Sequence, residues 1–96
     1  MQIERQQAGV KGMFYVGDPE NPQASMVYRV DGKHNIIIEH TEVNESLQGM
    51  NAGSQLVQAA VAYARESGIK ILATCPYARA VFQKKPEFSD VYIRLG

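Results

Sequence analysis

The order of apolar and polar residues divides the chain into two halves. In the first half apolar and polar positions alternate, which is the period of a β-strand, and the alternation is clearest over residues 25–30. In the second half apolar residues return every three or four positions, which is the period of a helix, over about residues 52–67. The change of period predicts a sheet in the first half and at least one helix in the second.

Four strands are predicted in the first half, with turn-forming residues between them. They cover a weaker segment at Gln2–Gln6, then Met13–Val16, Ser25–Val30 and about Asn35–Val43. Residues 17–22 are dense in Gly, Asp, Asn and Pro, and Asp31-Gly32 is a strong hairpin signal. Short turns of this kind join antiparallel neighbours, so we expect an antiparallel meander.

The second half is predicted to add a helix, a strand and a shorter helix. Gly68 stands where the first helix would end, and the β-branched run Ile69–Thr74 suits a buried strand. Pro76 suits the start of a second helix over Tyr77–Lys85, which Pro86 would end. Because a strand-helix-strand unit needs a crossover, the strands on either side of the first helix should be parallel. The fold class is therefore α+β, and the apolar tail up to Leu95 should pack back on it.

Composition and charge narrow the classes of protein that the chain can belong to. Its 96 residues predict a single domain over 1–96, and 45% hydrophobic with 21% charged residues is typical of a globular protein. Ten basic residues balance ten acidic ones, so the positive field that nucleic-acid binding needs is absent. The apolar stretches are much shorter than the roughly 20 residues of a membrane span. We expect a cytoplasmic monomer or weak homodimer without nucleic-acid or membrane partners, in which the single cysteine, Cys75, stays a free thiol.

The segment between the fourth strand and the first helix is suited to binding phosphate. It includes Gly49, Asn51, Ala52 and Gly53, whose small side chains leave backbone N–H groups uncovered. The helix that begins there adds a partial positive charge at its start. A diphosphate could therefore bind the loop without any basic side chain.

The predicted topology gathers further groups at the same edge of the sheet. Both parallel strands end on that side, which brings residues 40–43 and Cys75 close to the loop and to the helix after Pro76. A ligand with its phosphates on the loop could extend between the strand ends and reach Cys75. This arrangement suits a long phosphorylated cofactor.

Three sequence elements in this region resemble the GNAT superfamily of acyl-CoA-dependent N-acetyltransferases. The superfamily signature for phosphate binding is Gln or Arg, two residues, Gly, one residue, then Gly or Ala, and here it reads Gln48-Gly49-Met50-Asn51-Ala52-Gly53. Asn51 replaces the first signature glycine, and Asn tolerates positive φ better than most residues. The other two elements are His40-Thr41-Glu42-Val43 and Cys75-Pro76, which resemble those of minimal single-domain members.

The resemblance implies that acetyl-CoA or coenzyme A is the cofactor and that the parallel strands splay apart at their ends. Backbone groups near Val43 would bind the pantetheine arm, amides of residues 49–54 the pyrophosphate, and the thioester would lie near Cys75. The residues assigned to the cofactor are Thr41, Val43, Gln48, Gly49, Met50, Asn51, Ala52, Gly53, Ser54, Cys75, Ala78, Arg79 and Phe82. Larger members carry a Tyr that protonates the leaving thiolate at the position of Phe82, which has no proton to give.

Cys75 and His40 are the catalytic candidates. A thiol just before a helix start is favoured as thiolate by the helix dipole, so Cys75 could be a nucleophile that carries the acetyl group or a proton donor to CoA. His40 could act as a base or orient the thiol. It also shares strand parity with Ile36 and Ile38, so a core histidine is the alternative.

Several charged groups near this edge have two interpretations. Arg79 and Lys84 could reach the ribose phosphate of the cofactor, or belong to a solvated helix surface. The three glutamates between residues 39 and 45 could attract a cationic amine, or be a solvated loop. One Cys and two His do not supply a structural zinc site, and the Gly-x-Ser-x-Gly elbow of a serine hydrolase is absent.

Three functions follow from these observations. The first is an acetyl-CoA-dependent N-acetyltransferase that acts on an unidentified amine, small molecule or protein. The second is a non-catalytic module that binds or senses acyl-CoA, which Phe82 and Asn51 favour. The third is an interaction protein that keeps the fold without the cofactor.

Overall fold

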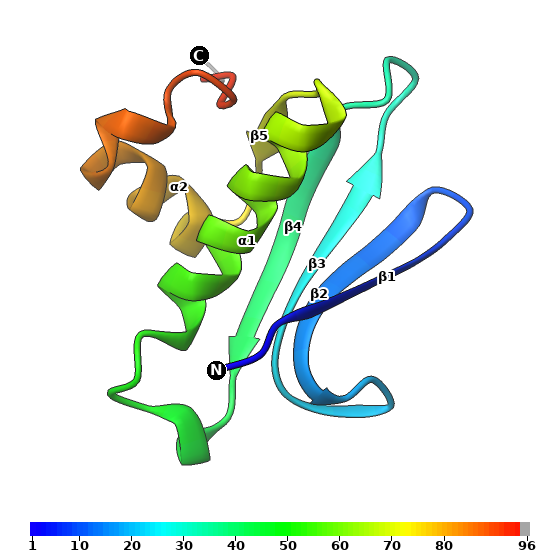
Figure 1. Cartoon of the computed structure of the whole chain (residues 1–96). Helices are drawn as coiled ribbons and strands as arrows, with labels where there is room; N and C mark the ends of the chain where they lie inside the picture. Colours follow the sequence, from blue (N-terminus) through cyan, green and yellow to red (C-terminus); the bar gives the residue numbers. More distant parts are fainter. Residues whose placement is uncertain (95–96) are drawn as a thin grey trace.

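A five-stranded sheet with the strand order β1-β2-β3-β4-β5 forms the frame of the molecule (Figure 1). The computed structural model describes residues 1–94. The strands are β1 (Glu4–Ala8), β2 (Lys11–Asp18), β3 (Asn21–Val30), β4 (Ile36–Val43) and β5 (Ile71–Ala73). β1 to β4 are antiparallel neighbours, and β4 and β5 are parallel. The predicted meander and parallel pair are confirmed.

Two α-helices and two short 3₁₀ helices complete the described part of the chain. They are η1 (Glu45–Leu47), α1 (Ala52–Ser67), α2 (Pro76–Lys84) and η2 (Pro86–Phe88). The predicted α+β fold is confirmed, although β1 lies two residues later than expected and β5 is shorter. No helix within residues 1–94 combines the length and apolar character needed to cross a membrane.

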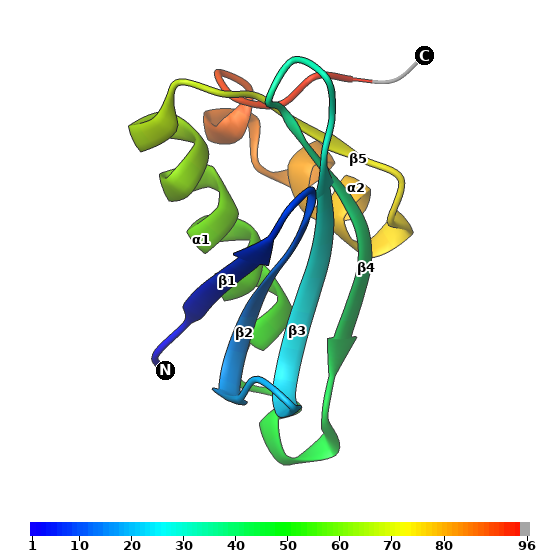
Figure 2. The same ribbon diagram turned by 90° about the vertical axis from the view of Figure 1, so that its right-hand side faces the viewer.

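α1 lies across one face of the sheet, as the two ribbon views show (Figures 1 and 2). Its buried stripe includes Leu56, Val57, Ala60 and Val61 and packs on fully buried strand residues such as Ile38. Burying a side chain of this size stabilises a fold by about 1.5–3 kcal/mol. The core therefore lies between α1 and the sheet, and it fixes where the start of α1 sits relative to the end of β4.

A close contact between β2 and β3 anchors this core. A Cβ on Gly12 would lie 2.2 Å from Cζ of Tyr28, so only glycine leaves room for the buried ring. The Tyr28 hydroxyl donates to Gln7 Oε1 (2.8 Å) and accepts from Arg5 Nη1 (2.9 Å). Burial raises the pKa of the Tyr28 hydroxyl, because its charged form would lose hydration.

The C-terminal segment returns along the outer edge of β5. The N–H of Ile71 donates to the carbonyl of Val91 (2.6 Å), and the N–H of Ile93 donates to the carbonyl of Ile71 (2.8 Å). Arg65 on α1 pairs with Asp90 at 3.0 Å and thereby ties the segment to the helix. The predicted return of the tail is thus observed through residue 94, and Leu95 lies outside the described residues.

Candidate functional site

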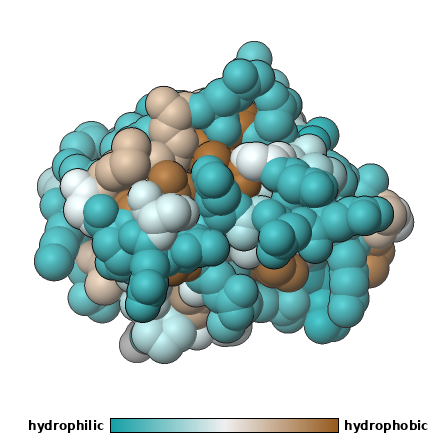
Figure 3. Space-filling view, turned by 90° about the horizontal axis from the view of Figure 1, so that it is seen from below, coloured by the Kyte–Doolittle hydropathy of each residue, from teal (hydrophilic) through white to brown (hydrophobic). Residues whose placement is uncertain are grey.

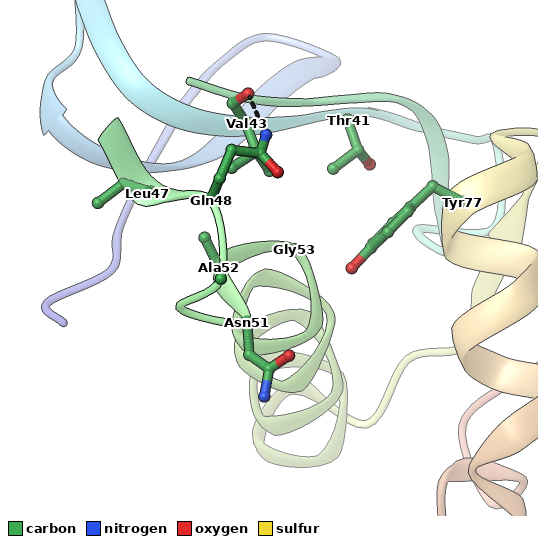
Figure 4. A pocket seen from close by; sticks show the side chains of 9 residues that line it. Thr41, Val43, Leu47, Gln48, Asn51, Ala52, Gly53 and Tyr77 are labelled. Carbon is green, nitrogen blue, oxygen red and sulfur yellow. Dashed lines mark hydrogen bonds between the residues drawn. The ribbon is translucent and has the colours of Figure 1, made fainter. Parts of the chain in front are cut away.

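A cavity of about 410 Å³ opens where β4 ends and α1 begins (Figure 4). Its lining comes from the end of β4, the connecting segment and the first turns of α1 and α2. The lining residues are Thr41, Val43, Leu47, Gln48, Gly49, Asn51, Ala52, Gly53 and Tyr77. Viewed from below, this end of the molecule is mainly hydrophilic, with apolar patches exposed between polar side chains (Figure 3).

Two residues with positive φ shape the loop before α1. Gly49 has φ 82°, and Asn51, the residue just before the helix, has φ 57° and ψ 31°. Both lie in the left-handed region, which Gly enters freely and Asn more easily than other residues. Asn51 therefore adopts at the first signature position a conformation that a glycine would also allow.

The start of α1 has no internal cap. The Asn51 side chain makes no capping hydrogen bond. Among the hydrogen bonds of residues 1–94, none has the backbone N–H of Gly49, Asn51, Ala52, Gly53 or Ser54 as its donor. These groups, together with the positive end of the helix dipole, form a cradle suited to an anion.

The parallel strands separate beside this cradle. β4 and β5 pair only as far as Ile38 and Ala73. The carbonyl of Ile38 then accepts from the N–H groups of both Thr74 (3.0 Å) and Cys75 (3.2 Å), and the chain turns away into α2. Beyond Ile38, β4 runs on to Val43 with no partner on this edge among the described residues. The predicted splay is confirmed.

A β-bulge decides which side chains of β4 face the cavity. Val27 pairs with His40 and Tyr28 with Ile38, so Glu39 is an extra residue without a partner on β3. An extra residue reverses the alternation beyond it. Thr41 therefore faces the side of the core and lines the cavity, whereas His40 faces the opposite side of the sheet.

The expectation that His40 shares the side of Ile36 and Ile38 is wrong, because it took the strand as regular. The His40 side chain is 61% exposed and its Nε2 lies 2.9 Å from Oε1 of Glu42. Within residues 1–94 it makes no hydrogen bond with Cys75.

Cys75 lies behind Thr41, which lines the cavity. It is the residue just before α2, it is 5% exposed, and its Sγ donates to Oγ1 of Thr41 at 3.5 Å. The Thr41 side chain lines the cavity and the Cys75 side chain does not. The predicted proximity of the thiol to the strand end is therefore observed, with a hydroxyl between the sulfur and the open space.

The other predicted cofactor residues fall into two groups. Thr41, Val43, Gln48, Gly49, Asn51, Ala52 and Gly53 line the cavity, whereas Met50, Ser54, Ala78, Arg79 and Phe82 do not. Phe82 is buried and its ring stacks on Tyr92 at 4.1 Å between ring centroids. Ala78 is buried as well, and Met50 and Arg79 are exposed.

Two lining residues, Leu47 and Tyr77, were not among the sequence candidates. Tyr77 lies against the start of α1, where a Cβ on Gly53 would be 2.4 Å from its hydroxyl oxygen. Tyr77 is 45% exposed although its side chain is large. Its hydroxyl end points towards the start of α1 (Figure 4). An aromatic residue directly after the proline that begins a helix was the available signal, but only the packing of α2 against α1 shows that the ring reaches the cradle.

The sequence matches a known family over most of its length. The model of the GCN5-related N-acetyl-transferase family matches residues 13–91, which run from within β2 to beyond η2 and include every residue that lines the cavity. The chain belongs to the GCN5-related N-acetyltransferase family.

A solved member of this family has a closely similar fold. The solution NMR structure of a GCN5-like candidate N-acetyltransferase from Staphylococcus aureus is 39% identical in sequence, with a TM-score of 0.73. The match covers 97% of this chain and 90% of that protein.

A curated relative extends the comparison to a vertebrate. Protein NATD1 of Danio rerio is 30% identical over 64 residues, which is 67% of this chain. The matched region spans 58% of the length of NATD1.

Proposed function

We propose that this protein binds acetyl-CoA and transfers the acetyl group to an amine. The observation that carries the proposal is the uncapped start of α1, whose free N–H groups line a cavity that continues to the unpaired edge of β4. Membership of an N-acetyltransferase family supports the same reaction class.

The diphosphate of the cofactor binds the cradle formed by Gly49 and residues 51–54. The only charged side chain between residues 44 and 54 is that of Glu45, so backbone dipoles must supply the positive potential. A helix start stabilises an anion by about 0.3–1 kcal/mol at an exposed position and about 2 kcal/mol where the geometry is partly buried. Gly49 lets the phosphate oxygens approach the backbone without a side chain between them, and Gly53 leaves room for the Tyr77 hydroxyl beside the cradle.

The pantetheine arm extends from the diphosphate along β4. Past Ile38 the strand has an unpaired edge, and an arm with amide groups can add to such an edge as another strand would. The carbonyl of Val43 accepts from Gln48 Nε2 at 3.4 Å, which holds the signature glutamine against this strand. The arm then brings the thioester to Thr41.

The chemistry at Thr41 is a direct attack by the amine. The amine nitrogen forms a bond to the thioester carbonyl carbon, the C–S bond breaks, and the CoA sulfur leaves with the electron pair. Thr41 Oγ1 accepts a hydrogen bond from the Cys75 thiol, so its own proton is free to pass to the leaving sulfur, and the thiol proton of Cys75 replaces it. The attacking nitrogen releases its surplus proton to solvent, and solvent returns a proton to the Cys75 sulfur. A sulfur that lies behind Thr41 favours this proton path over an acetyl-cysteine intermediate.

A second candidate function is a module that binds acyl-CoA without transfer. Phe82 is enclosed by Phe88 and Tyr92 and has no acidic proton to offer the cofactor. In the described chain a turn of only two residues joins β1 and β2. This connection therefore contains no helix that could form one side of a binding pocket for the amine.

Titration with CoA and acetyl-CoA, followed by NMR of the backbone amides, tests the binding step. The amides of residues 49–54 should shift together with that of Cys75, and saturating CoA should raise the melting temperature. Unchanged amides and an unchanged melting temperature would refute both functions. Residues 31–35, at the other end of β4, are the internal control.

Acetyl-CoA consumption on a panel of amines then separates transfer from binding alone. Thr41→Val removes the hydroxyl at almost constant volume, so it should lower turnover while CoA affinity stays unchanged, and Thr41→Ser should retain turnover. Binding without turnover on any amine would favour the second function. An acetyl group found on Cys75 by intact-mass measurement, and absent from Cys75→Ser, would replace direct attack by a covalent relay.

A further inference from the structure

We propose that a second hollow, on the other side of Tyr77, binds the ribose phosphate at the nucleotide end of CoA. The hollow has a volume of about 250 Å³ and lies between the start of α1 and one face of α2. This inference rests on the proposed binding of CoA and assigns specific side chains to one group of the cofactor.

The two hollows are continuous in their lining. Asn51 and Tyr77 contribute to both of them, and Ser54 of α1 belongs to the second only. The first hollow extends from this shared wall towards β4, and the second extends from it along α2. A linear ligand with its diphosphate on the loop therefore has one arm on β4 and the other on α2.

One face of α2 forms the floor of the second hollow. Tyr77, Ala80, Val81 and Lys84 line it, which is the spacing of residues on a single helix face. Ala80 is small and leaves the space open. Arg79 lies about 200° around the helix from Tyr77, so it points to the opposite side of α2. The structure therefore places Lys84 at the hollow and Arg79 away from it, whereas the sequence offered both as partners of the ribose phosphate.

The charge of this hollow suits a phosphomonoester. Lys84 and Lys85 both line it, no Asp or Glu does, and neither lysine forms a salt bridge with another described residue. A phosphomonoester carries about −1.5 to −2 charges at neutral pH, so two lysines and the nearby start of α1 complement it well. Lysines at the C-terminal end of a helix also stabilise the helix through its dipole. The experiment therefore measures phosphate binding and protein stability separately.

Comparison of CoA with dephospho-CoA, which lacks only the ribose phosphate, provides the test. Affinities of the full-length protein for both nucleotides are measured by calorimetry at low and at high salt. Wild type should prefer CoA by about tenfold at low salt, and less at high salt, because two exposed ion pairs of ordinary strength give a preference of this size.

Charge-removing variants assign the preference to side chains. Lys84→Gln should reduce the preference for CoA several-fold while affinity for dephospho-CoA stays the same, and Lys85→Gln should have a similar effect. Lys33→Gln, which makes the same charge change in the turn between β3 and β4, is the matched control and should keep the full preference.

Each outcome has a separate meaning. Equal affinity of wild type for both nucleotides would overturn this inference and leave CoA binding intact, whereas no affinity for either would overturn the proposed function itself. A preference that survives in both lysine variants but disappears in Arg79→Gln would assign the phosphate to the other side of α2 and refute the inference. A lysine variant with lower affinity for both nucleotides and a lower melting temperature would show a structural role instead.

Discussion

Substitutions at Asn51 should separate the stability of the loop from its affinity for CoA. The residue has φ 57° and ψ 31°, and its side chain makes no capping bond, so the backbone conformation is its main contribution to stability. Asn51→Gly keeps that conformation free of strain and should change the free energy of unfolding by less than about 0.5 kcal/mol. Asn51→Ala should lower it by about 1 kcal/mol, because alanine pays the left-handed penalty that Asn partly avoids.

Asn51→Asp should change the two properties in opposite directions. An aspartate tolerates the same φ and sits at the positive end of α1, which favours the folded state by about 0.3–1 kcal/mol. The same carboxylate would face the diphosphate. Two unit charges about 4 Å apart interact by about 1 kcal/mol in water and about 4 kcal/mol near a protein surface, so CoA affinity should fall by about tenfold or more.

Urea unfolding followed by circular dichroism gives the stabilities, and calorimetry gives the CoA affinities at constant ionic strength. Asn21→Asp, an equal charge change at the exposed start of β3, is the control and should leave CoA affinity within about twofold, since it is screened by solvent. If Asn51→Asp binds CoA as tightly as wild type, the diphosphate does not lie beside residue 51. If Asn51→Ala is as stable as Asn51→Gly, the left-handed conformation is not required.

Four further substitutions test the core, the position of Phe82 and the C-terminal segment. Gly12→Ala should lower the free energy of unfolding by about 1–3 kcal/mol in urea titrations, because its Cβ would overlap the buried Tyr28 ring, and a variant as stable as wild type would contradict that packing. Phe82→Ala should lower it by about 3–5 kcal/mol, since the ring is buried against Phe88 and Tyr92. Phe82→Tyr should leave acetyl-CoA turnover unchanged, and a gain in turnover would show that this position reaches the cofactor. The Arg65 guanidinium holds the pKa of Asp90 below its ordinary value, so the stability that the pair contributes is present at neutral pH and is lost as the pH falls through the lowered pKa of the folded state. The stability difference between wild type and Asp90→Asn should therefore shrink in acid, and a difference that stays constant from neutral pH to strong acid would refute the pairing.

Local sequence signals predicted the elements of this fold well because each has a local cause. The helical period and Gly68 predicted a helix over about residues 52–67, which are the observed bounds of α1. Gly68 adopts φ 69° at the end of the helix. Pro76 located the start of α2, and the turn residues located the hairpins of the meander. The loop before α1 was predictable for the same reason, since small residues between a strand and a helix leave backbone donors uncovered wherever they occur.

The arrangement of side chains around the cavity depended on contacts between distant segments. The bulge at Glu39 arises from the pairing of β4 with β3, and it moves Thr41 to the cavity and His40 away from it. The packing of α2 against α1 places Tyr77 over Gly53. The same packing decides that Lys84, and not Arg79, lines the second hollow. The sequence by itself thus determined which segments become strands and helices and where a loop leaves a space lined by uncovered backbone donors. Only the tertiary structure decided which side chains share that space, because register and helix packing are set by the whole core rather than by neighbours along the chain.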